Sequence, residues 1–145
     1  MKHFLFLLAS LLISTGIQSQ TLGVLKYSGG GDWYSNPTAL PQLIEFCNEH
    51  LGTTLEPQIK TVSLDSDALF DLPWIHMTGH GNVFFSESEI ETLKAYLLGG
   101  GFLHIDDNYG MDSYIRPILS GLFSEAPLIE LPTRHPIFTE FYKFP

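Results

Sequence analysis

The fold of this chain is decided by the stretch GGGFLHIDDNYG at residues 99–110. Its three glycines end a helix, and the following residues, Phe102–Ile105, have apolar character on both faces, which is typical of a short buried strand. The strand pattern ends in two acids, an amide and a glycine. Because ligands of open α/β sheets bind outside the carboxyl ends of the strands, we expect a site near Asp106, Asp107 and Asn108.

Strand and helix patterns alternate on both sides of this stretch. Strands are predicted at residues 22–27, 59–64, 73–78, 101–106 and 128–131. Helices are predicted at residues 38–51, 86–98 and 112–123, with a short and partly helical link at 65–71. Thr38 is expected to cap the first helix, and Ser86 with Glu89 forms a capping-box pattern at the second. The regular alternation predicts an α/β domain in which a mostly parallel sheet carries helices on both faces.

Composition bounds the size of the domain and excludes some partners. The chain has 145 residues, of which 44% are hydrophobic, so one domain with one core is expected. Its formal net charge is −9, and no run of like charges occurs. Nucleic acid and anionic lipid are therefore not expected as partners, since binding them needs clustered Lys and Arg. The single cysteine, Cys47, lies in the apolar stripe of the first helix, which predicts a buried and unreactive thiol.

The N-terminus has the pattern of an export signal. Lys2 is basic, residues 4–13 are apolar but too few to span a bilayer, and residues 14–20 are small and polar. We expect a signal peptide at residues 1–19, followed by a single α/β domain at residues 20–145. For a bacterial source, the mature protein would be periplasmic or secreted, with no membrane span after removal of the signal.

Three loops are expected at the same edge of the sheet, at residues 28–36, 79–85 and 106–110. Each contains glycine, which lets a backbone approach a ligand closely, although glycine, asparagine and aspartate are also ordinary turn residues. A small polar ligand is expected there. The candidate ligand-binding residues are Gly30, Gly31, Asp32, Trp33, Tyr34, Gly79, Asn82 and Asn108.

Catalysis is a second hypothesis for the same edge. Asp106 or Asp107 could act with His80 as a general acid or base. Because the two aspartates are adjacent, their side chains should point to opposite sides, one to the site and one to cap the following helix. No G-x-S-x-G motif marks a serine nucleophile.

The histidines leave a divalent metal open as a cofactor. Imidazole and carboxylate groups suit zinc or a similar ion, but no H-E-x-x-H spacing is present, so no metal ligand is assigned. His76 and His104 lie within predicted strands, where hydrogen-bonded core histidines are the more common outcome.

Three segments in order, Leu25–Tyr34, Met77–Asn82 and Gly99–Asn108, together resemble the bacterial family catalogued as domain of unknown function 4159. The resemblance runs from Leu22 to the last residue. It implies an open, flavodoxin-type fold similar to class I glutamine amidotransferases. In those enzymes a cysteine occupies the turn that holds Asp106 or Asp107 here, so glutamine hydrolysis is not expected. The resemblance also implies that family members continue past Pro145, so the domain would be incomplete at its C-terminus.

These observations lead to three functional hypotheses. The first is an exported module that binds a small polar ligand, such as a glycan or another cell-envelope component, without amidotransferase chemistry. The alternative is a hydrolase that acts on an envelope or carbohydrate substrate through an Asp/His site, with or without a metal. The third is a structural partner in an envelope complex.

Overall fold

The computed structural model describes residues 19–142, so the predicted signal peptide, apart from Ser19, lies outside the described residues. Four parallel strands form one sheet in the order β2-β1-β3-β4. The strands are β1 (Leu22–Leu25), β2 (Lys60–Val62), β3 (Trp74–His80) and β4 (Phe102–Tyr109). This is the strand order of flavodoxin-like folds, and the predicted α/β class with an open parallel sheet is confirmed.

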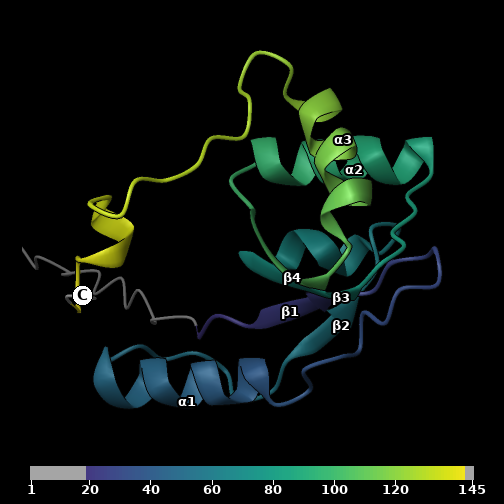
Figure 1. The fold of residues 1–145 in the computed structure, drawn as a ribbon. Coiled ribbons are helices and arrows are strands. Elements are labelled where there is room, and N and C mark those ends of the chain that lie inside the picture. The colour runs from purple at the N-terminus through teal and green to yellow at the C-terminus, as the bar shows by residue number, and fades with distance from the viewer. Residues whose placement is uncertain (1–18, 143–145) are drawn as a thin grey trace, which may run out of the picture.

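Helices cover both faces of the sheet (Figure 1). Helix α1 (Ala39–His50) lies on one face, and α2 (Glu87–Leu98) and α3 (Asp112–Leu122) lie on the other. Two short 3-10 helices, η1 (Asp67–Asp71) and η2 (Pro136–Phe138), complete the elements of the described residues. Within residues 19–142, no helix has both the length and the apolar character that a membrane span requires.

The main core lies between the sheet and the α2–α3 layer. Ile75 and Met77 of β3 are fully buried, as is Leu93 of α2. The predicted capping box fixes the start of α2, because the Ser86 backbone N–H donates to the Glu89 carboxylate at 2.8 Å and the Ser86 hydroxyl accepts from the Glu89 N–H. Local sequence thus positions α2, and apolar burial holds it against β3.

Two strands reach further than their apolar patterns. The break predicted at Gly79 is wrong, since β3 continues through Gly79 and His80. The end predicted for β4 at Asp106 is also wrong, because the strand continues to Tyr109. Backbone pairing between the two strands extends the ladder here, with Thr78 opposite Asp106 and Gly79 opposite Asp107. The pairing supplies hydrogen bonds where the side chains have already become polar.

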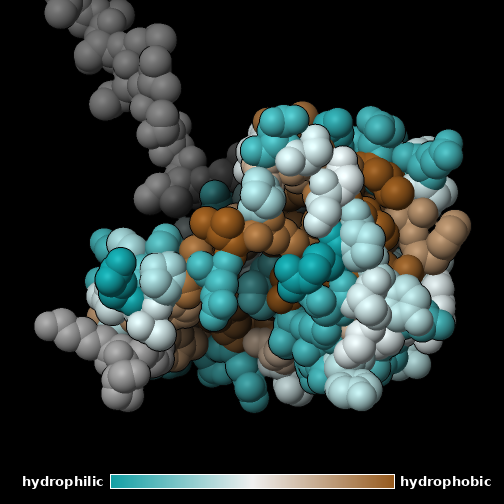
Figure 2. Space-filling view, turned by 45° about the horizontal axis from the view of Figure 1, so that its top comes forward, coloured by the Kyte–Doolittle hydropathy of each residue, from teal (hydrophilic) through white to brown (hydrophobic). Residues whose placement is uncertain are grey.

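The fifth strand predicted at residues 128–131 does not form. Leu128 and Ile129 are exposed, and the segment has no neighbouring strand to pair with in the described residues. A short apolar run becomes a strand only when a partner satisfies its backbone groups. Figure 2 shows hydrophobic side chains exposed among hydrophilic ones on the face that it draws, so apolar surface is present outside the core.

Helix α1 is less buried than its pattern predicts. Only Leu40 and Ile44 are buried, so the sheet covers just the first two turns of the helix. Cys47 is therefore half-buried, and the prediction of a fully buried thiol is wrong. Thr38 precedes the helix but makes no side-chain cap hydrogen bond, because its backbone is already helical.

Candidate functional site

The three loops predicted to meet do lie together at the carboxyl edge of the sheet. Backbone hydrogen bonds join them: Gly31 N–H donates to the Asn82 carbonyl at 3.0 Å, and Gly81 N–H donates to the Tyr109 carbonyl at 2.9 Å. The first two loops are bonded again where Phe84 N–H donates to the Ser28 carbonyl at 2.8 Å. The loops therefore support one another, although they are far apart in the sequence.

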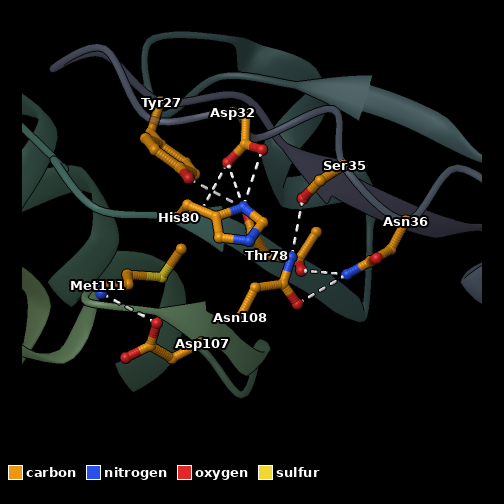
Figure 3. Close-up of polar contacts among 9 residues, drawn as sticks. All are labelled: Tyr27, Asp32, Ser35, Asn36, Thr78, His80, Asp107, Asn108 and Met111. Carbon is orange, nitrogen blue, oxygen red and sulfur yellow. Dashed lines mark hydrogen bonds and ion pairs between the residues drawn. The ribbon is translucent and has the colours of Figure 1, made fainter.

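An aspartate from the loop after β1 and a histidine at the end of β3 form the central polar contact (Figure 3). The Asp32 carboxylate lies 2.9 Å from His80 Nδ1 and also accepts the His80 backbone N–H at 2.5 Å. These two hydrogen bonds, the backbone one first, hold the pKa of Asp32 below its usual range. A carboxylate that stays ionised requires a proton on Nδ1, so in the neutral ring Nε2 is the hydrogen-bond acceptor.

Beneath this pair, only glycine fits at position 79. A Cβ atom there would lie 2.2 Å from the Tyr27 hydroxyl and 3.0 Å from an Asp32 carboxylate oxygen, and φ is +142°. The Tyr27 hydroxyl donates to the Thr78 carbonyl at 3.0 Å. Burial, followed by the nearby charges of Asp32 and Asp107, raises the pKa of Tyr27 to about 12, so the phenol keeps its proton.

The two adjacent aspartates have different surroundings. Asp107 accepts the backbone N–H groups of Met111 and Asp112, each at 2.9 Å, and so caps the start of α3. Asp106 lies close enough to His76 for its charge to raise the pKa of that histidine against the stronger effect of burial. Sequence reasoning paired His80 with one of these two aspartates, whereas its hydrogen-bonded carboxylate is Asp32.

Asn108 joins the loop after β1 to the end of β4. The register between β3 and β4 shifts at this point, since Gly79 lies opposite Asp107 and His80 lies opposite Tyr109. The extra residue, Asn108, accepts from Asn36 Nδ2 at 3.0 Å and donates to the Ser35 hydroxyl at 3.1 Å. Ser35 and Asn36 were not among the predicted residues, and the signal that could have indicated them is the Asn-Pro turn dipeptide at 36–37.

Of the eleven predicted site residues, six line neither of two separate hollows, and five line one of them: Gly30, Trp33, Tyr34, His80 and Asn82. The first, here called the outer hollow, has a volume of about 470 Å³ and opens outside the ends of β3 and β4. Its wall includes His80 and Asn82, the exposed rings of Tyr109 and Tyr114, and the backbones of three glycines. Gly30 contributes from the loop after β1, which brings all three loops into this wall.

The second hollow, here called the α1 cavity, lies between α1 and the sheet and has a volume of about 200 Å³. Trp33 and Tyr34 belong to its wall, together with His76 and Thr78 of β3. The two aromatic residues therefore lie away from His80, with which the sequence analysis grouped them.

His76 and His104 face each other across β3 and β4. Their Nδ1 atoms are 2.9 Å apart, and both rings stack with Trp74. His76 is buried as predicted, but His104 is exposed, because β4 is the edge strand and α1 does not reach over it. Within residues 19–142, no three side chains of histidine, cysteine, aspartate or glutamate come together as a metal site would require.

No curated protein matches this chain. The family described as domain of unknown function 4159 (DUF4159) matches residues 21–145, which include every strand and helix of the described fold. The match covers the same segments that carried the resemblance in the sequence, and the chain therefore belongs to the DUF4159 family.

Proposed function

We propose that the protein binds a small polar ligand in the outer hollow, and that the ligand is a carbohydrate. The observation that carries this proposal is a histidine of fixed tautomer, His80, in the same wall as two exposed tyrosine rings, Tyr109 and Tyr114. Tyr109 is 80% exposed, although an aromatic ring of this size would gain free energy from burial. An exposed ring beside an oriented polar group is typical of a surface that a partner covers.

Carbohydrate chemistry matches this combination of groups. A sugar ring presents apolar C–H groups that pack on an aromatic face, and hydroxyl groups that both donate and accept hydrogen bonds. His80 Nε2 supplies an acceptor, and the Tyr109 and Tyr114 hydroxyls supply further polar contacts. The glycine backbones of the wall allow the ligand to approach closely.

Binding without hydrolysis is the favoured reading of the chemistry. In the described part of the chain, His80 has no hydrogen bond to a serine, threonine or cysteine side chain, so it activates no protein nucleophile there. Cys47, the only cysteine of the sequence, lies on α1 and not in the outer hollow, which supports the absence of glutamine amidotransferase chemistry. We place the protein outside the cytoplasm, in the periplasm or secreted, on the pattern of residues 1–19 alone.

A specific observation also supports hydrolysis as a second candidate. The Asp32–His80 pair has the geometry of an oriented general base, which could remove a proton from a water molecule. In that case His80 would be catalytic and Asp32 a positioning residue, and a sugar substrate would be cleaved rather than only bound.

The test is a titration with envelope-type disaccharides that contain N-acetylglucosamine, followed by NMR. Resonances of His80, Tyr109 and Tyr114 should shift, and His80→Ala and Tyr109→Ala should weaken binding about tenfold or more. His50→Ala, on exposed α1, is the matched control and should bind as the wild type does. A panel without any shift at these residues would reject the carbohydrate proposal, and newly formed reducing ends that disappear in Asp32→Asn would identify the hydrolase instead.

A further inference from the structure

The α1 cavity is separate from the outer hollow, and no residue belongs to both walls. Leu40 closes it from the side of α1, and Val24 and His76 form its floor on β1 and β3. Its opening lies near Tyr34 and Thr61, both of which are exposed. The cavity is therefore enclosed by the fold on the helix side and reachable from solvent on the other.

No charged residue lines the cavity among the residues that the structure describes. Burial, and then the neighbouring His104, lower the pKa of His76, so its ring is neutral in the physiological range. The opposing effect of Asp106 is smaller. A ligand of this cavity should consequently be uncharged, because no counter-charge is present to compensate for its desolvation.

The ring of His76 is held on two sides. It stacks on Trp74 with ring centres 5.8 Å apart and planes within 5°, and its Nδ1 lies 2.9 Å from His104 Nδ1. The other nitrogen, Nε2, is buried and has no hydrogen-bond partner in the described residues. Buried polar atoms are almost always paired, so an unpartnered nitrogen on a residue that lines a cavity points to a group that the cavity receives.

The histidine pair determines what Nε2 can do. Only one of the two facing Nδ1 atoms carries the shared proton. When His76 donates it, His76 Nε2 is an acceptor, and when His104 donates it, His76 Nε2 is a donor. Ser35, Asn36 and Thr78 of the wall already hydrogen-bond to other protein groups. Among the described residues, Nε2 of His76 is the buried side-chain nitrogen of this wall that has no partner.

We propose that the α1 cavity is a second binding site, and that it takes a small uncharged aromatic ring compound with one hydrogen-bonding group directed at His76 Nε2. An apolar cavity of about 150 Å³ accommodates benzene, so the volume here suits one ring or a small fused ring system. Trp33 in the wall provides an aromatic surface for such a ring. This inference is independent of the carbohydrate proposal.

The test compares indole with indene, which has the same shape but lacks the N–H group. Indole should bind the protein at a one-to-one ratio and shift the NMR resonances of His76 and Trp33. Indene should bind about fivefold to tenfold more weakly, because it leaves Nε2 unpaired. Equal affinity for the two compounds, or no binding of indole at millimolar concentration, would overturn the proposal.

Two variants locate the site. Thr61→Phe fills the opening from the exposed strand β2 and should abolish indole binding, whereas Lys60→Phe places the same ring on the opposite face of β2 and should not. His76→Phe should make indole and indene bind equally. If His76→Phe does not fold, Thr61→Phe alone tests whether indole binds in the α1 cavity. Unchanged indole binding by Thr61→Phe would reject the site. Tyr109→Ala, in the outer hollow, should retain indole binding.

Discussion

The outer hollow and the α1 cavity both involve strand β3, the hollow at its last residue, His80, and the cavity at His76 and Thr78, but they are built differently. Loop backbones and exposed side chains form the hollow, and His80 is one of its lining residues. The cavity is formed by side chains from strands and a helix, and its central histidine, His76, is buried. We therefore expect substitutions in the hollow to affect ligand binding, and substitutions in the cavity to affect the stability of the fold as well.

The largest effect is expected at Gly79, which lies between the two regions. Gly79→Ala would place a Cβ 2.2 Å from the Tyr27 hydroxyl, in a backbone conformation with φ +142°. We expect it to lower the free energy of unfolding by about 3 kcal/mol or more, measured by urea denaturation. The matched control is Gly81→Ala, where φ is +61° but no atom lies within 4 Å. It should cost only about 1 kcal/mol, and equal losses in both variants would show that the close packing around Gly79 is not decisive.

The second largest effect on stability is expected in the wall of the α1 cavity, and little effect is expected in the wall of the outer hollow. Leu40→Ala removes a side chain that is only 3% exposed and should cost about 2–4 kcal/mol in the free energy of unfolding. Tyr109→Ala removes a ring that is 80% exposed and should change stability by less than about 0.5 kcal/mol while weakening ligand binding. Thermal and urea unfolding of both variants measures the difference. A strong loss of stability in Tyr109→Ala would mean that the hollow also supports the fold.

Alkaline pH should lower the free energy of unfolding because of the ionisation of Tyr27. Its pKa in the folded protein is raised to about 12, by burial first and then by Asp32 and Asp107, whereas an unfolded tyrosine ionises near 10. Between these values the unfolded chain has lost a proton that the folded chain keeps, so stability falls as pH rises from about 10 to about 12. Tyr27→Phe should lack this part of the decrease. Urea denaturation at several alkaline pH values measures it, and parallel curves for the two proteins would contradict the prediction.

The smallest effect is a decrease in the free energy of unfolding at mildly acid pH, caused by protonation of His76 in the α1 cavity. His76 has a lowered pKa in the folded protein, caused by burial and then by His104, with Asp106 opposing. Its contribution to stability is present above the unfolded pKa of about 6.5 and is lost as pH falls through the folded value. His76→Phe should therefore lose less stability than the wild type between about pH 6.5 and pH 5. Urea midpoints at both pH values check this, and an equal loss in the two proteins would contradict it.

Prediction from the sequence succeeded where a local pattern is sufficient. The capping box at Ser86 and Glu89 formed as predicted, because its donors and acceptors are three residues apart. The parallel sheet followed from the alternation of elements. The predicted strand at 128–131 failed, because strand formation depends on a partner that a local pattern does not contain.

The α/β class, the DUF4159 family and the three loops at one edge of the sheet could all be predicted from local sequence patterns. Which side chains contact one another at that edge depends on how the loops pack in three dimensions. Asp32 and His80 are 48 residues apart in the chain, and their pairing depends on the bend of two loops over Gly79. Likewise, Trp33 lies in the α1 cavity although Asp32 contacts His80. These adjacent residues can serve different sites because the chain turns here, with Ser35 N–H donating to the Asp32 carbonyl at 2.8 Å. Which space each side chain enters is set by the elements packed around the turn.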